Sequence, residues 1–167
     1  MSDLENLYQD VILDHAREKH GYGLTGPVAA HSHQVNPTCG DEITLGVATD
    51  SEGRIARIVW EGQGCSISTA SASLLTDLVE NYATLGPESV GHSSSVGNSE
   101  ALLHAIHVFR DLLRSRGTGE PDADVLGDAV ALAGVSRYVT RVKCAMLPWV
   151  ALEDALNRLA ASAMSQD

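Results

Sequence analysis

Apolar residues at helical spacing open the chain and return throughout its second half. The i, i+3, i+4 rhythm that begins at Leu4 predicts an amphipathic helix running to about His20, where Gly21 and Gly23 end it. Similar stripes predict helices that follow Cys65, that surround residues 102–113, that cover 125–133, and that begin around 141–145. The Ser/Gly-rich segment 88–98 predicts a loop. Most of the chain is therefore expected to be helical.

Between the first two helices the pattern changes to the two-residue alternation of β-strands. Residues 43–48 alternate apolar and small or polar positions, which predicts a half-buried strand, and 54–61 is rich in β-formers. The turn residues at 50–53 predict that these two strands pair as an antiparallel hairpin. A weaker alternation at 31–35 predicts an edge strand. Strands grouped early and helices grouped late indicate one α+β domain over 1–167, with a small antiparallel sheet of about three strands packed against several helices.

Composition narrows the classes of partner. The chain has 167 residues, a net charge of -11 and three cysteines. The acidic surplus makes nucleic acid and anionic membranes poor partners, and it would attract a basic protein surface. No apolar run approaches the roughly 20 residues of a membrane span, and the first residues lack the pattern of a signal peptide. An odd number of widely separated cysteines argues against a disulfide framework. We therefore expect a cytoplasmic protein with free thiols.

The candidate chemistry centres on the segment Asn-Pro-Thr-Cys-Gly-Asp-Glu-Ile at 36–43. Cys39 and Asp41 are two residues apart, so in an extended chain both side chains point to one side. Cys65 stands at the start of a predicted helix, and Cys144 follows Arg141 and Lys143 near the start of another, so each is expected in a setting that favours the thiolate.

Three thiolates and one carboxylate suit a tetrahedral zinc ion or an iron–sulfur cluster. The spacings between positions 39, 65 and 144 match no zinc-finger pattern. From the residues alone, two interpretations therefore remain, a shared metal site and three separately buried thiols.

Three motifs follow one another along the chain: Asn-Pro-Thr-Cys-Gly-Asp at 36–41, Gly-Gln-Gly-Cys-Ser-Ile-Ser-Thr-Ala-Ser at 62–71, and Arg-Val-Lys-Cys-Ala-Met-Leu at 141–147. Together they resemble the IscU/SufU family of iron–sulfur biogenesis proteins. The first helix resembles that family's opening as well, so the likeness covers nearly the whole chain. The SufU branch fits better than IscU, because IscU proteins have a His where this chain has Lys143, and because 87–120 resembles the insertion of SufU-like proteins.

This resemblance implies a SufE/NifU-like fold and a zinc site made by Cys39, Asp41, Cys65 and Cys144. It implies a zinc-dependent sulfurtransferase that accepts persulfide sulfur from a SufS-type cysteine desulfurase and passes it on for iron–sulfur cluster assembly, with other SUF scaffold proteins as further partners. Cys39 would leave the zinc and receive the sulfur. Arg141 would hold Asp41 or Cys39 until that release.

Two other functions stay open. The same ligands would let the protein act as a scaffold that assembles an iron–sulfur cluster, or they would form a structural zinc in a binding module. Asp41 argues against the structural zinc, because dedicated structural sites prefer Cys and His. His104 and His107 are expected on an ordinary helix surface, and Trp60 and Trp149 in the core or at an interface.

Overall fold

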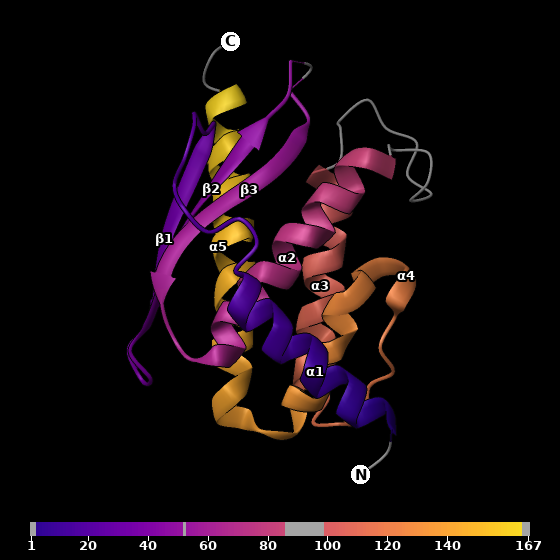
Figure 1. Cartoon of the computed structure of the whole chain (residues 1–167). Coiled ribbons are helices and arrows are strands. Elements are labelled where there is room, and N and C mark those ends of the chain that lie inside the picture. Colours follow the sequence, from indigo (N-terminus) through magenta and orange to yellow (C-terminus); the bar gives the residue numbers. More distant parts are fainter. Residues whose placement is uncertain (1–2, 52, 86–98, 165–167) are drawn as a thin grey trace.

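The expected α+β architecture is confirmed by the computed structural model, which describes residues 3–51, 53–85 and 99–164. Within those ranges five α-helices accompany one three-stranded antiparallel sheet of order β1-β2-β3 (Figure 1). The elements in chain order are α1 (Asp3–Glu18), β1 (Ala30–Asn36), β2 (Asp41–Thr49), β3 (Ile55–Gln63), α2 (Ser66–Leu85), α3 (Ser99–Arg114), α4 (Ala123–Leu126), the 3-10 helix η2 (Gly127–Arg137) and α5 (Val139–Met164).

The predicted hairpin is confirmed and has a definite register. Leu45 lies opposite Trp60 and Val47 opposite Ile58, so four apolar side chains face the core from the β2–β3 pair. The tight turn closes with a hydrogen bond from the Gly53 N–H to the Asp50 carbonyl at 3.1 Å. The predicted edge strand also forms. It is β1, which pairs with β2 and lies at the edge of the sheet. The alternation of side chains therefore set both the strands and the face that each buries.

The strand β2 is more buried than its alternation predicts. Gly46 and Ala48, expected on the open face, are both buried. The reason is tertiary, because the segment before β1 crosses that face. An added Cβ on Gly46 would lie 2.8 Å from a methyl of Val28, and the Ala29 N–H bonds to the Val47 carbonyl at 2.8 Å. The segment before β1 thus covers the face of β2 that the local sequence predicts to be exposed.

Helices α5 and α2 pack on the inner face of the sheet, α5 against β1 and β2, and α2 against β3 (Figure 1). The core behind them contains Trp149, which is fully buried and stacks on Phe109 with ring centroids 3.9 Å apart. The Trp149 Nε1–H donates to Ser71 Oγ at 2.9 Å, and Ser71 donates to the Ala145 carbonyl at 2.6 Å. Buried hydrogen bonds therefore fasten α2 to α5 beside Cys144.

Two helix predictions are wrong in detail. The helix expected over 125–133 is the four-residue α4 followed by η2, which continues past Gly134 to Arg137. Asp122 caps α4 through its side chain, and Gly127, with φ of 55°, ends it. The last helix begins at Val139, earlier than predicted, and it contains Pro148 in its interior.

Other expectations lie outside the described residues. The 88–98 loop and the end of the second helix at Gly86-Pro87 belong to that group. The insertion at 87–120 stays a prediction, although its described part contains α3. Among the described helices, none combines the length and the apolar character that crossing a bilayer requires.

Candidate metal centre

Cys39 lies in the tight turn that joins β1 to β2. The turn closes with a hydrogen bond from the Gly40 N–H to the Asn36 carbonyl at 2.9 Å, and Gly40 has φ of 76°, a conformation that side chains with a Cβ rarely adopt. The Asn36 side chain accepts from the Thr38 N–H at 3.2 Å. Local hydrogen bonds therefore shape the turn, and the Cys39 side chain stays exposed on it.

Asp41 is the buried centre of the site, with 3% of its surface exposed. As the first residue of β2 it pairs with Asn36, which fixes its backbone. Its Oδ1 accepts a hydrogen bond from the Cys65 N–H at 3.2 Å, and its Oδ2 lies 3.8 Å from Cys65 Sγ. An added Cβ on Gly64 would lie 3.0 Å from Oδ1, so only glycine leaves the carboxylate this room. Asp41 thus connects the first two motifs.

Cys65 occupies the predicted junction between β3 and α2. Its carbonyl accepts from the Thr69 N–H at 3.1 Å and from Ser68 Oγ at 3.0 Å, the pattern of a residue that precedes the first turn of a helix. The side chain is partly buried. The expected setting at a helix N-terminus is therefore observed.

Cys144 differs from the expectation. It lies in the second turn of α5, is 2% exposed, and approaches the Thr140 carbonyl at 3.9 Å. Burial raises the pKa of its thiol, and hydrogen bonds with Asp41 and Cys39 raise it further. Arg141 and Lys143 are both exposed, so neither compensates for this burial. The prediction that the polypeptide itself favours the Cys144 thiolate is wrong. A thiolate at this position needs an added positive charge.

The tertiary structure excludes three separately buried thiols. The Sγ atoms of Cys39 and Cys144, 105 residues apart, are separated by 3.5 Å. Single donor atoms of Cys39, Asp41 and Cys144 all lie within 4.8 Å of one another, and Cys65 joins this group through Asp41. Around a tetrahedral zinc ion, with Zn–S of about 2.3 Å, sulfur atoms lie about 3.8 Å apart. The donor set therefore fits a metal, and its chemistry suits both Zn²⁺ and an iron–sulfur cluster.

Arg141 lies beside the centre in the first turn of α5. It lines a cavity of about 790 Å³ together with Ser66 and Thr140. In the described part of the chain it makes no hydrogen bond or ion pair with Asp41 or Cys39, so its holding role stays a prediction. Lys143 lines a different cavity of about 410 Å³, shared with Arg110 and Arg114 of α3.

Sequence reasoning missed two features. One is the hydrogen bond from the Cys65 backbone to Asp41, which no pattern of residue types announces. The other is a group formed by His15, Glu18 and His20 at the end of α1. The spacing of three residues between His15 and Glu18 places them on one helix face and was a signal that could have found it.

Comparison with known proteins gives relatives that include cluster assembly scaffolds and a sulfurtransferase. The model of the NifU-like N terminal domain matches residues 7–145. The iron-sulfur cluster assembly scaffold protein IscU of Streptococcus pyogenes serotype M1 is 38% identical over 96% of this chain and 89% of its own length. The zinc-dependent sulfurtransferase SufU of Bacillus subtilis (strain 168) is 34% identical over 94% of each chain. The crystal structure of a putative iron-sulfur cluster assembly scaffold protein for the SUF system from Fervidobacterium islandicum AW-1 superposes with a TM-score of 0.72, at 27% identity, over 91% of this chain and 98% of that one.

Proposed function

Because this chain belongs to the NifU-like N-terminal domain family of iron–sulfur cluster assembly proteins, we propose that it is a zinc-dependent sulfur acceptor for a SufS-type cysteine desulfurase. The relative from Bacillus subtilis that carries the name zinc-dependent sulfurtransferase is similar over 94% of the chain. The sulfur would then be passed on for cluster assembly, with SUF scaffold proteins as recipients.

The contrast in exposure within one donor group carries this proposal. Cys39 is exposed on a turn, whereas Asp41 and Cys144, its neighbours in the group, are 3% and 2% exposed. A thiol that must meet a partner's persulfide has to reach the surface, and a thiol that only holds a metal does not. Cys39 is therefore the acceptor, and Cys65 and Cys144 with Asp41 are the residues that stay in place.

The transfer balances without a further reagent. The Cys39 thiolate attacks the outer sulfur of the persulfide on the desulfurase. An S–S bond forms at Cys39 while the S–S bond of the donor breaks, and the donor cysteine leaves as a thiolate. One cysteine persulfide is consumed and one is formed, so no external oxidant or reductant takes part.

Zinc would be held by Cys39, Asp41, Cys65 and Cys144. When bound, it supplies the positive charge that keeps these thiols deprotonated at neutral pH. Asp41 contributes a hard oxygen ligand among soft sulfurs, which suits a site whose ligand at position 39 exchanges. Arg141, at the start of α5, would hold the Asp41 carboxylate or the Cys39 thiolate until the partner arrives.

The second candidate is a scaffold that assembles an iron–sulfur cluster on the same donors. It is favoured by the three convergent thiols and by the IscU relative, which is named as a cluster assembly scaffold. Here the cluster is cargo, and anaerobic reconstitution should give a cluster that is stable and transferable to an apo-protein. A reconstituted protein that holds no such cluster would remove this candidate.

The deciding experiment is a cysteine desulfurase assay with and without this protein, with bound zinc measured in parallel. We expect about one zinc per chain and a desulfurase turnover that rises several-fold when the protein is added. Zinc-free protein should not stimulate until zinc is restored. Equal turnover with and without the protein would overturn the acceptor role.

A further inference from the structure

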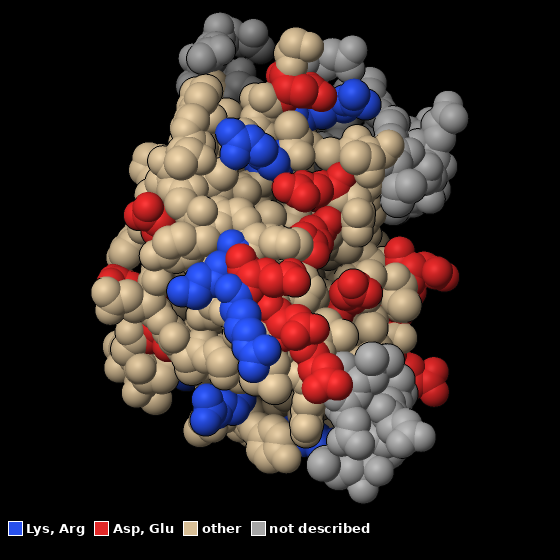
Figure 2. Space-filling model, viewed as in Figure 1, with Lys and Arg blue, Asp and Glu red and all other residues tan. Residues whose placement is uncertain are grey.

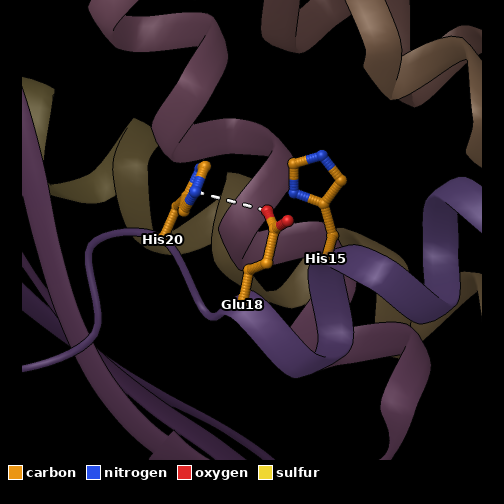
Figure 3. A group of neighbouring side chains, drawn as sticks. All are labelled: His15, Glu18 and His20. Atoms are coloured by element: carbon orange, nitrogen blue, oxygen red, sulfur yellow. Dashed lines mark ion pairs between the residues drawn. The ribbon is translucent and has the colours of Figure 1, made fainter.

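A second group of metal-ligating side chains lies at the C-terminal end of α1, apart from the thiol centre. Helix α1 ends at Glu18, and positive φ values at Lys19 and Gly21, 50° and 81°, turn the chain sharply there. The turn brings His20 back toward His15, and their rings meet edge to face with centroids 5.7 Å apart. Figure 3 shows the Glu18 carboxylate between the two imidazole rings. One donor atom from each of the three residues lies within 4.8 Å of the others.

A carboxylate of α2 lies behind His20. Asp77 places Oδ1 at 2.5 Å from His20 Nδ1 and Oδ2 at 3.7 Å from His15 Nε2. On the other side of His20, Nε2 lies 3.3 Å from Glu18 Oε2. Asp77 therefore fixes the His20 ring through Nδ1 and leaves Nε2 to the cluster, where two imidazoles and the Glu18 carboxylate form the donor group. Such nitrogen and oxygen donors suit borderline first-row divalent cations, of which zinc is the commonest in proteins.

His15 is oriented as a ligand would be. It is 8% exposed, and its Nδ1 lies 2.8 Å from Ser73 Oγ, which also accepts from the His20 backbone N–H at 3.0 Å. A hydrogen bond at one ring nitrogen fixes the orientation of a histidine whose other nitrogen binds a metal. The other nitrogen, Nε2, points to the cluster, and its ion-pair partner in the described chain, Asp77, lies beyond hydrogen-bond distance.

The surroundings favour a cation. The charges of Asp77, Glu18 and Glu80 all act on His20, so the negative charge around its ring attracts a cation. The ammonium of Lys19 lies 5.1 Å above the Tyr22 ring, and among the described residues it forms no ion pair with these carboxylates. Figure 2 shows acidic side chains along the line of α1 on this face of the molecule.

A purely structural role would use fewer of these contacts. A tether between α1 and α2 requires the contacts of Asp77 with His20 and His15, and it does not use Glu18. We propose that His15, Glu18 and His20 form a second binding site for a divalent transition-metal ion such as Zn²⁺, with Asp77 orienting His20 through its other ring nitrogen. Asp77 lies 12 residues beyond Cys65, so about 18 Å of helix separates this site from the thiol centre. The second site does not depend on the proposed sulfur transfer.

Calorimetric titration of the full-length, untagged protein with ZnCl₂ tests the proposal, after the thiol centre has been loaded with one equivalent. We expect one further equivalent to bind. In His20→Ala and in Asp77→Asn, zinc should bind this second site at least tenfold more weakly. The first equivalent should be unchanged in both variants. These positions are chosen because their side chains are 47% and 31% exposed, whereas His15 is buried and bonded to Ser73.

His33→Ala is the matched control, because His33 is 54% exposed and pairs with Glu42 at 3.7 Å, in β1 and β2. It should bind both equivalents normally. Titration with Co²⁺ gives a second readout, since a nitrogen and oxygen site lacks the sulfur-to-cobalt charge-transfer bands of the thiol centre. Absence of a second equivalent in the parent protein would overturn the proposal. So would a second equivalent that persists in both variants, or one that disappears in His33→Ala as well.

Discussion

The thiol centre and the histidine cluster differ in how far apart along the chain their donor residues lie. The thiol centre draws its donors from the β1–β2 turn, the start of α2, and α5, up to 105 residues apart. The histidine cluster takes its three donors from one turn at the end of α1, and α2 supplies Asp77, which orients His20. The first therefore depends on the whole fold, whereas the second depends mainly on one helix end and its contact with α2.

The two groups also differ in the softness of their donor atoms and in the chemistry of their most exposed residue. Soft thiols with one carboxylate surround an exposed cysteine that is free to react. Imidazoles and carboxylates surround an exposed histidine that has no redox or nucleophilic sulfur chemistry. Under the proposals above, only the thiol centre accepts sulfur, while both groups hold a divalent cation.

The largest expected effect comes from Cys39→Ala. Sulfur acceptance should be abolished, because no other described thiol of the centre is exposed, and desulfurase stimulation should fall to the level without this protein. Thr38→Ala, at the adjacent exposed position, is the control and should stimulate normally. Normal desulfurase stimulation by Cys39→Ala would contradict the assignment of Cys39 as acceptor, because a less accessible thiol would then accept the sulfur.

The next effect comes from Gly62→Ala, which tests dependence on the whole fold. An added Cβ would lie 2.2 Å from the Glu42 carbonyl oxygen, so the β2–β3 backbone must shift. We expect a loss of about 2 kcal/mol or more in the free energy of unfolding, measured by urea denaturation, and weaker zinc binding at the thiol centre.

Gly134→Ala is the control for that variant, because an added Cβ there meets no atom within 4 Å. Its free energy of unfolding should change by less than about 0.5 kcal/mol. A Gly62→Ala protein as stable as the parent would show that the sheet tolerates displacement beside the centre.

Asp41→Ala should separate metal retention from sulfur transfer. We expect zinc exchange to slow and sulfur transfer to fall, because the hard carboxylate is proposed to be the ligand that keeps the site labile. The Cys65 N–H also loses its acceptor, at a cost of about 1–3 kcal/mol in unfolding free energy. Glu42→Ala, at an exposed neighbouring position, controls for the lost charge. Unchanged sulfur transfer would show that the carboxylate is dispensable.

The smallest expected effect comes from Asp154, which belongs to neither the thiol centre nor the histidine cluster. A hydrogen bond from Ser32 at 2.7 Å lowers the pKa of Asp154, and Arg158 lowers it further. Because the folded pKa is depressed, this stabilisation is present above the ordinary value of 3.8 and is lost as pH falls through the folded pKa. Asp154→Asn should therefore flatten the acid limb of a stability–pH curve by less than about 1 kcal/mol. An unchanged acid limb would contradict this.

Local sequence determined the strands, the hairpin and most helices, because alternation, turn residues and helical stripes act over a few neighbouring residues. Residues 43–48 show this for β2, and Gly53 shows it for the hairpin turn. The motifs around Cys39, Cys65 and Cys144 also carried the family resemblance, which the comparisons then showed.

Only the tertiary structure decided what these residues meet. It buried Cys144 and raised its pKa, where sequence neighbours suggested a favoured thiolate. It placed the Cys39 and Cys144 sulfurs 3.5 Å apart and brought Asp77 to the histidines of α1. Burial and donor geometry depend on elements distant in the chain, so no local pattern of residue types contains them.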